Sequence, residues 1–422
     1  MGKELINWLN SYQFHGIKPG LKRIRQLLKL LGNPQKKFKT IHIAGTNGKG
    51  STSAILSTIL SEHGLKTGLY TSPHLFRINE RFKINQKDIS DEELTYYLRI
   101  IKEVVKGREV TYFEITTALA FFYFAEKKVD IAVIECGLGG RLDATNVIFP
   151  EVSVITNVGF DHTRYLGNTL ESIAREKAGI IKKEKPCVLG NVKKEVLGVF
   201  EEKAKRMKSR IYMFGRDFFV KKEKENWYFS GERELVNLEL SLKGGFQGVN
   251  LGCALKTCEI LERKGIFEFS EKKIREALKK VVWEGRYQKL RIKGKEILLD
   301  VAHNIEGLKT LKKALCEENF KNFLLIFGVS NEDGNKDFKG MLEEIKPLAK
   351  NVFICEFPCP RKIVTISEWE EVIKRDSGIS FFKDYKEALK NALVSVEERI
   401  LVTGSIYFVA EVLKMLRGKE IA

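Results

Sequence analysis

The feature of this sequence that most restricts its fold is a glycine-rich turn between an apolar strand and a helix. Residues 40–44 (TIHIA) predict a buried strand and residues 51–64 predict a helix. Glycines in such a turn let backbone N–H groups face an anion, and the start of a helix adds a partial positive charge. The pattern predicts a phosphate-binding loop in which Lys49 meets the β- and γ-phosphates of a nucleotide. The turn comprises Gly45, Thr46, Asn47, Gly48, Lys49, Gly50 and Ser51.

The turn departs from the common G-x-x-x-x-G-K-[ST] pattern at two positions. Ile43 stands where the first glycine is expected, and Gly50 separates Lys49 from Ser51. A glycine-rich turn by itself could be purely structural. The combination of strand, lysine and helix nevertheless favours phosphate binding.

Short apolar runs alternate with helical segments along the chain, which predicts an α/β fold with parallel sheets covered on both faces. Strands are expected first at 40–44, 130–136, 152–156 and 186–190, and after residue 285 at 297–302, 323–329, 351–355 and 400–405. Helices are expected at 51–64, 91–106, 114–127, 169–182 and 195–207. The two series predict two α/β domains, residues 1–285 and 286–422, with a small antiparallel meander at about 210–242 appended to the first.

Composition limits the class of protein. A chain of 422 residues that is 43% hydrophobic is long enough for two or three domains and is not disordered. The longest apolar run, residues 118–125, is far shorter than the roughly 20 residues of a membrane span, and the N-terminus lacks the apolar core of a signal peptide. We therefore expect a cytoplasmic protein with no membrane partner.

The formal net charge of +18 suits a polyanionic ligand. Lysines are interleaved with glutamates, however, and are not gathered into a basic stripe. We therefore expect no nucleic-acid partner, although a nucleic-acid-dependent P-loop ATPase remains an alternative on charge alone.

Ionisable residues follow the predicted strands, where ligands bind in open parallel sheets. Glu135 ends a buried strand, where an unpaired carboxylate is costly without a cation, so it predicts a magnesium ligand. Asp161 and His162 follow the next strand, but imidazole is an unusual magnesium ligand and His162 could be structural. Asp300 suits a ribose hydroxyl or a cation, with a helix cap as the alternative.

A further pair of charged residues has an ambiguous position. Glu176 and Lys177 lie in the helix predicted over residues 169–182. Periodicity alone allows both to be ordinary surface charges.

Nine motifs in order between Gly45 and Tyr407 resemble the folylpolyglutamate synthase/dihydrofolate synthase family of the Mur ligase superfamily. They are GTNGKGS (45–51), YTSPHLFRINER (70–81), TYFE (111–114), ECGLGGRLDATN (135–146), DHTRYLG (161–167), REKAGIIK (175–182), GR (285–286), DVAHN (300–304) and TGSIY (403–407). The resemblance implies a P-loop ATPase domain followed by a smaller Rossmann-like ligase domain. It also implies ATP-driven joining of a carboxylate to the amine of glutamate, through an acyl phosphate.

The resemblance also implies a role for each matching residue. The turn Gly45–Ser51 would hold ATP phosphates, Asn250 would contact adenine, and Arg286 and Asp300 would reach ATP from the linker and the second domain. Magnesium, as two ions, would be bound by Ser72, Glu135, His162 and a carbamylated Lys177. The pterin side would be contacted by Thr111, Tyr112, Phe113, Glu114, Leu142, Asp143 and Ala144, and the incoming glutamate by His303 and Ser405.

The implied partners are ATP, L-glutamate, dihydropteroate and reduced folates, and we expect a monomer. The TYFE and RLDA segments resemble those of bifunctional bacterial members, which favours both acceptors. A muramyl-peptide-type amino-acid ligase is the closest alternative. Such ligases usually carry a nucleotide-sugar-binding domain before the P-loop, and the 44 residues that precede Gly45 are too few for one.

Overall fold

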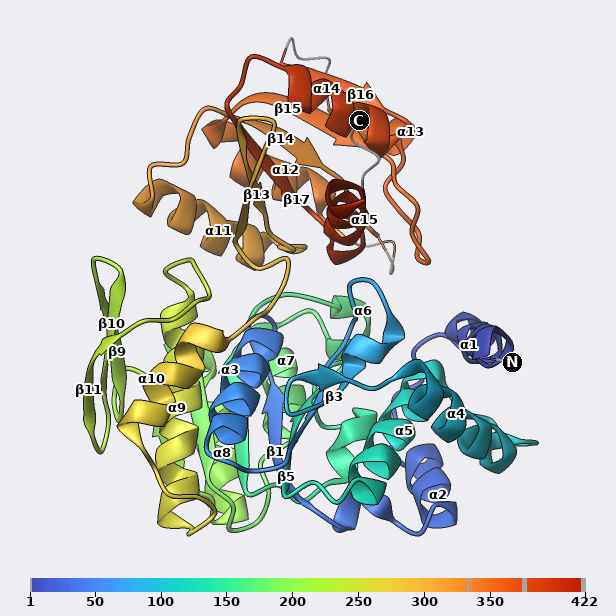
Figure 1. The fold of residues 1–422 in the computed structure, drawn as a ribbon, viewed down its shortest axis with the longest axis vertical. Coiled ribbons are helices and arrows are strands. Elements are labelled where there is room, and N and C mark those ends of the chain that lie inside the picture. The colour runs from blue at the N-terminus through green and yellow to red at the C-terminus, as the bar shows by residue number, and fades with distance from the viewer. Residues whose placement is uncertain (1, 332–333, 335, 374–377, 419–422) are drawn as a thin grey trace. The chain divides into compact units, whose positions relative to one another are not determined.

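Two sheets of mainly parallel strands organise the chain, which confirms the predicted α/β class (Figure 1). The computed structural model describes residues 2–331, 334, 336–373 and 378–418. The chain divides into two compact units. The first unit contains the chain up to Gly159, together with Leu166–Ser241 and Gln247–Val282. The second contains Phe160–Tyr165, Leu242–Phe246 and the chain from Trp283 onward.

The first unit is built on an eight-stranded sheet with the order β4-β3-β2-β5-β1-β6-β7-β8. Its central strand β1 (Lys39–Ala44) is buried after its first residue and pairs in parallel with β5 (Ile131–Glu135) and β6 (Val152–Asn157). The remaining strands are β2 (Thr67–Tyr70), β3 (Phe82–Ile84), β4 (Lys87–Asp88), β7 (Cys187–Asn191) and β8 (Ile211–Met213). The carboxyl ends of β2, β5, β1 and β6 therefore meet at one edge of the sheet, where ligands bind in folds of this kind.

This sheet also contains two antiparallel edge strands that the sequence did not indicate. Strands β3 and β4 pair antiparallel beside β2. They contain only three and two residues, too few to produce an apolar run in the sequence. An antiparallel strand can follow its neighbour after a short connection, without the helical crossover that a parallel strand requires.

Helices cover this sheet. Helix α3 (Lys49–Glu62) packs against α9 (Gln247–Arg263) and α10 (Glu271–Lys280). Helix α7 (Leu170–Ala178) packs against α8 (Lys194–Met207). The other helices of this part of the chain are α1 (Gly2–Ser11), α2 (Lys22–Leu30), α4 (Asp91–Val105), α5 (Tyr112–Glu126) and α6 (Thr163–Leu166), with 3₁₀ turns η1 (Tyr12–His15), η2 (Pro34–Lys36), η3 (Ile78–Arg81) and η4 (Ala144–Val147).

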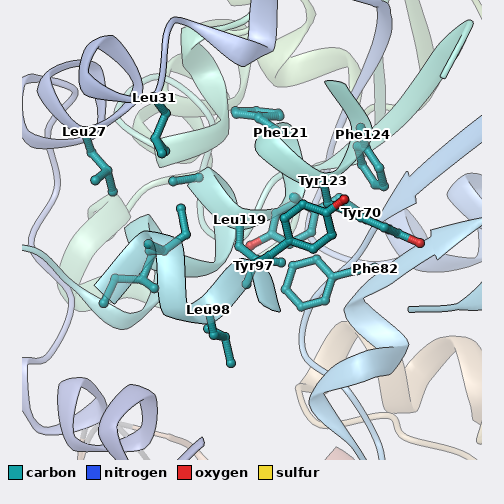
Figure 2. Close-up of a cluster of buried hydrophobic side chains, with 14 of the residues drawn as sticks. Leu27, Leu31, Tyr70, Phe82, Tyr97, Leu98, Leu119, Phe121, Tyr123 and Phe124 are labelled. Carbon is teal, nitrogen blue, oxygen red and sulfur yellow. The ribbon is translucent and has the colours of Figure 1, made fainter. Parts of the chain in front are cut away.

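A large aromatic core joins α1, α2, α4 and α5 to the sheet (Figure 2). Tyr70 of β2 stacks on Phe82 of β3 with ring centroids 5.7 Å apart, and Tyr97 packs edge-on to Tyr123 at 5.3 Å. Helix α5 is apolar on nearly all sides because it is buried between α4, α2 and the sheet. This core fixes the start of α5, which lies at the ligand-binding edge.

Two predicted segment boundaries were wrong. Residues 211–213, expected to begin the meander, form β8 and pair in parallel with β7. The meander itself is a three-stranded antiparallel sheet of β9 (Phe219–Glu223), β10 (Asn226–Ser230) and β11 (Glu234–Leu238), beside α9 and α10 (Figure 1). Helix α7 ends at Ala178, before the predicted end, and the carbonyl of Glu176 in its last turn accepts from the backbone N–H of Arg141 at 2.7 Å.

The second unit is built on a six-stranded sheet with the order β12-β13-β17-β14-β15-β16. All neighbours are parallel except the antiparallel hairpin of β12 and β13, a second exception to the predicted parallel arrangement. Its strands are β12 (Gln288–Ile292), β13 (Lys295–Leu299), β14 (Phe323–Phe327), β15 (Ala349–Cys355), β16 (Ile379–Phe382) and β17 (Arg399–Thr403). Its helices are α11 (Ile305–Glu317), α12 (Phe338–Ile345), α13 (Ile366–Val372), α14 (Tyr385–Val394) and α15 (Ile406–Arg417), with the 3₁₀ turn η5 (Lys346–Leu348).

The predicted division at residues 285 and 286 lies close to the division between Val282 and Trp283. The structure differs in assigning Phe160–Tyr165 and Leu242–Phe246 to the second unit. Phe246, for example, packs edge-on to Tyr287 at 6.3 Å. None of the described helices is both long enough and apolar enough to cross a membrane.

Candidate active site

The predicted phosphate loop connects β1 to α3, and its glycines are required by close contacts. Gly48 precedes α3 with φ of 82°, and a Cβ there would lie 2.3 Å from Oδ1 of Asn250. Gly45 has φ of 155°, and a Cβ there would lie 1.9 Å from Oγ1 of Thr156. A side chain at either position would therefore displace the loop or its support. Asn250, expected at the adenine, lies on α9 directly behind the loop, and its contact with adenine stays a prediction.

The loop is held in place from the end of β6. Oδ1 of Asn157 accepts hydrogen bonds from the backbone N–H of Thr46 at 3.1 Å and of Asn47 at 2.9 Å. Thr156 donates to the carbonyl of Asn47 at 2.6 Å, and Oγ1 of Thr46 accepts from Gly159 N–H at 3.0 Å. The N–H groups of Thr46 and Asn47 thus anchor the loop, and phosphate binding by the first turn of α3 and by Lys49 stays a prediction.

The first turn of α3 begins at Lys49 and includes Gly50 and Ser51, both buried. The first N–H groups of a helix have no acceptor within the helix and are available to an anion. Nζ of Lys49 folds back over the loop and donates to the carbonyls of Gly45 at 3.0 Å and Thr46 at 3.2 Å. The ammonium is therefore held above the loop that it is predicted to serve.

Two predicted magnesium ligands lie together at the ends of neighbouring strands. Glu135 ends β5 and is buried, with 4% of its surface exposed. Its Oε2 accepts a hydrogen bond from the backbone N–H of Ser72, which follows β2, at 3.0 Å. A buried carboxylate beside a serine supplies the oxygen donors that magnesium prefers, so these residues fit the ion.

The described residues contain no group of three or more His, Cys, Asp or Glu side chains that could hold a metal ion by themselves. Magnesium commonly retains water and takes phosphate oxygens, so two protein oxygens are a sufficient anchor. The third predicted ligand, His162, belongs to the second unit and has a φ of 49°, a strained backbone for a histidine. Its assignment to magnesium stays a prediction.

Lys177 is buried, with 2% of its surface exposed, so the interpretation of this residue as an ordinary surface charge was wrong. Its neighbour Glu176 does reach the surface side of α7, where Oε1 accepts from Arg141 at 2.7 Å. Burial disfavours the ammonium form of a lysine, and the neutral amine is the form that reacts with carbon dioxide.

The predicted pterin contacts at the start of α5 include a capping group. Thr111 is the N-cap of α5. The backbone N–H and the hydroxyl of Thr111 both donate to Oε2 of Glu114, at 2.8 and 3.0 Å, which completes a capping box. The same carboxylate pairs with Arg23 of α2 at 3.1 Å. Glu114 is therefore committed to holding the helix start, which presents Tyr112 and Phe113. The ring of Phe113 lies against Gly137, where a Cβ would approach it to 2.4 Å.

The second predicted pterin segment is held in a similar way. Asp143 caps η4 and accepts from the N–H groups of Thr145 at 3.0 Å and Leu138 at 2.7 Å. Burial raises the pKa of the Asp143 carboxyl, and these hydrogen bonds oppose the shift. The neighbouring Leu142 and Ala144 are fixed by this cap, and the carbonyl of Leu142 accepts from the N–H of Gly20 at 3.3 Å.

A buried histidine links this segment to the sheet, and no sequence motif indicated this contact. Nε2 of His42 lies 2.8 Å from Oγ1 of Thr145 and 3.0 Å from Sγ of Cys136, which follows Glu135. Burial holds the pKa of His42 well below its usual value, with the charge of Lys182 acting in the same direction. His42 lies within the apolar run TIHIA, where periodicity predicts only a core position.

Residues at and just before the start of α2 also lie at this site, and no motif indicated them. Gly20 contacts Leu142, Lys18 forms an ion pair with Glu109, and Arg23 pairs with Glu114. Residues 18–23 thus touch both segments predicted to bind the pterin. Nothing in their own pattern indicates a ligand, and only the folded chain brings them there.

In the second unit, Asp300 follows β13 and is anchored by backbone groups. Its carboxylate accepts from the N–H of Tyr287 and of Ala302, each at 2.8 Å. Burial raises the pKa of Asp300, while the positive charge of Arg286 opposes the shift. Arg286 and Asp300, both predicted to reach ATP, therefore lie close to each other. Their contact with ATP stays a prediction.

A polar cluster surrounds Asp161, to which the sequence analysis assigned no role. Asn304, the N-cap of α11, donates to Oδ2 of Asp161 at 3.0 Å, and Nε2 of His303 lies 3.5 Å from the same oxygen. Burial acts to raise the pKa of Asp161, but the bond to His303 and the charges of His303 and His162 hold it well below its usual value. Ser405, also predicted on the glutamate side, is buried at the start of α15 with its hydroxyl 3.0 Å from that of Ser330.

Comparisons with known proteins identify the family and the fold of the chain. Residues 43–258 match the Mur ligase middle domain, and residues 285–406 match the Mur ligase glutamate ligase domain. The dihydrofolate synthase/folylpolyglutamate synthase of Bacillus subtilis (strain 168) is 34% identical over 428 residues, covering 97% of this chain and 98% of that protein.

Solved structures resemble the whole chain. The crystal structure of folylpolyglutamate synthase from Thermotoga maritima has a TM-score of 0.86 and 37% identity, covering 100% of this chain and 98% of that chain. The structure of E. coli FolC in complex with DHPP and ADP has a TM-score of 0.88 and 30% identity, covering 98% and 97% respectively.

Proposed function

The chain belongs to the Mur ligase family, in its folylpolyglutamate synthase/dihydrofolate synthase branch, and we propose that it adds L-glutamate both to dihydropteroate and to reduced folates. It is an ATP-dependent ligase that adds glutamate to folates. The use of dihydropteroate as well as folates as acceptor is the part that we propose.

The observation that best supports the proposal is the grouping of three features at one edge of the first sheet. The phosphate loop follows β1, the pair of Ser72 and Glu135 follows β2 and β5, and the segments 111–114 and 142–144 flank the same strand ends. ATP, magnesium and an acceptor acid would therefore meet above neighbouring strands. Phosphoryl transfer depends on this kind of positioning and charge neutralisation.

The chemistry proceeds in two steps. A carboxylate oxygen of the acceptor attacks the γ-phosphorus of ATP, the bond to ADP breaks, and an acyl phosphate forms. The amine of glutamate then attacks the acyl carbon, phosphate leaves, and the amine proton is lost. Lys49 and the first turn of α3 hold the phosphates in place through both steps.

ATP-dependent ligases of this kind use magnesium, which would neutralise charge on the transferred phosphoryl group when bound. We propose that Ser72 and Glu135 hold it, and that Lys177 is carbamylated. A carbamate turns the buried Lys177 amine into an anion that could bind a second ion. In ¹³C-bicarbonate, the wild-type protein should show a carbamate resonance that Lys177→Ala lacks, and equal spectra would contradict the modification.

The function is tested by ADP release from purified protein with ATP, magnesium and glutamate, offering dihydropteroate and tetrahydrofolate in separate reactions. Mass spectrometry of the products should show one added glutamate in each case. Release of ADP with only one acceptor would restrict the proposal to that acceptor, and release with neither would refute it. Lys49→Ala should abolish turnover with both.

A further inference from the structure

We propose that Arg81 binds the aryl carboxylate through which dihydropteroate reacts, an assignment that rests on the proposed function. Arg81 ends the 3₁₀ turn η3 in the segment between β2 and β3. Only 7% of its surface is exposed, yet no carboxylate among the residues that the structure describes lies within ion-pair distance of its guanidinium. A buried cation without an anion is costly, so the position favours a ligand that supplies one.

The guanidinium is held in one orientation by two neighbours that carry no negative charge. Its Nε donates to Nδ1 of His74 at 2.8 Å. Because arginine can only donate, Nδ1 must be the unprotonated nitrogen of that ring. The carbon of the guanidinium lies 5.3 Å from the centre of the Tyr112 ring, within the range of a cation–π contact.

These two contacts leave the terminal nitrogens of Arg81 for a ligand. Within the described part of the chain, neither terminal nitrogen donates to a side chain or to a backbone carbonyl. Two parallel N–H groups match the two oxygens of a carboxylate, an arrangement that lysine cannot provide. The hydroxyl of Tyr112 is also buried and has no hydrogen-bond partner among the described residues. Tyr112 therefore offers a ligand of Arg81 a second polar group.

The surroundings of Arg81 identify which carboxylate would bind. The carbonyl of Arg81 accepts from the N–H of Thr71 at 3.2 Å, and the next residue, Ser72, donates to Glu135. Arg81 is therefore joined through its backbone to the strand end beside Ser72, and its side chain lies against Tyr112, a predicted pterin contact. A dihydropteroate molecule with its ring on the Tyr112 side would have its aryl carboxylate beside Arg81. In a reduced folate the reacting carboxylate stands on a glutamate tail and would lie farther from Arg81.

The test compares two ligands that differ only at the reacting group: 7,8-dihydropteroate and its primary carboxamide. Binding is measured by calorimetry with a non-hydrolysable ATP analogue and magnesium present. Wild-type protein should prefer the acid, and Arg81→Gln should weaken binding of the acid by about 10- to 100-fold while leaving the carboxamide unchanged. Arg81→Lys, which keeps the charge but loses the paired geometry, should fall between the two.

Arg77→Gln is the matched control. Arg77 lies four residues earlier in the same segment, is exposed and is paired with Asp91, so this variant should bind both ligands as wild type does. Unchanged affinity of Arg81→Gln for the ATP analogue would show that the fold is intact. Equal preference for the acid in wild type and Arg81→Gln would overturn the assignment and leave the proposed function standing. Wild-type protein that binds neither ligand would contradict the proposed function and this inference with it.

Discussion

Asn157 offers a direct test of how the phosphate loop is held. Its side-chain oxygen accepts hydrogen bonds from the N–H groups of Thr46 and Asn47. Asn157→Ala removes both side-chain bonds, each worth about 1 kcal/mol, but the N–H of Thr46 keeps a longer bond of 3.3 Å to the Asn157 carbonyl, so the variant should cost about 1–2 kcal/mol of loop order. If that order is recovered only when ATP binds, the affinity for ATP should fall about 5- to 30-fold. The affinity for dihydropteroate should not change.

Two further variants separate the hydrogen bonds from charge. Asn157→Asp keeps the acceptor oxygen but adds a negative charge near the phosphates, so it should retain thermal stability while it weakens ATP binding. Asn191→Ala is the matched control, because Asn191 is exposed at the neighbouring position of β7. Calorimetry with a non-hydrolysable ATP analogue and a thermal melt provide the measurements. Wild-type ATP affinity and melting temperature for Asn157→Ala would refute the reasoning.

Three more predictions follow from the structure and the composition. Lys256 and Glu259 form an ion pair of 2.8 Å with side chains 2% and 1% exposed, and Glu259 also accepts from the N–H groups of Glu232 and Arg233. Glu259→Met should therefore cost about 3–5 kcal/mol in chemical denaturation, whereas Glu232→Met, which removes only the partly exposed partner of Lys256, should cost clearly less; equal losses would contradict this. Burial lowers the pKa of Lys182 to about 8. The unfolded chain therefore keeps the lysine proton over a pH range in which the folded chain has lost it. The stability of the wild type relative to Lys182→Met should rise between about pH 8 and 10, and parallel pH profiles of the two proteins would contradict this. Because the net charge is +18, affinity for folates with long glutamate tails should weaken with salt more steeply than affinity for monoglutamates, and equal salt slopes would argue against it.

Elements of the fold with a strong local signal could be predicted from the sequence. The runs around residues 41, 133 and 154 are apolar throughout because they are buried on both faces, and the structure places them in adjacent parallel strands. The edge strands β3 and β4 are too short to leave such a signal. The start of β8 was misread because its three residues continue directly toward the meander.

Prediction of the site had a similar limit, because motifs identify residues but not the contacts that those residues make. Sequence motifs indicated Glu135 and Ser72, and the structure joins them by a hydrogen bond. Motifs could not show that Glu114 uses its carboxylate to cap α5 and to pair with Arg23, because that depends on a contact between residues far apart in the chain. Periodicity assigned Lys177 to a helix but could not tell which face of that helix is buried.

The central claim is that an oxygen of the acceptor carboxylate attacks the γ-phosphate held by the loop before glutamate is joined. It is tested most directly with dihydropteroate labelled with ¹⁸O in its carboxylate, turned over with ATP, magnesium and glutamate. The account predicts one labelled oxygen in the inorganic phosphate for each amide bond formed. Amide formation that leaves the phosphate unlabelled would contradict it.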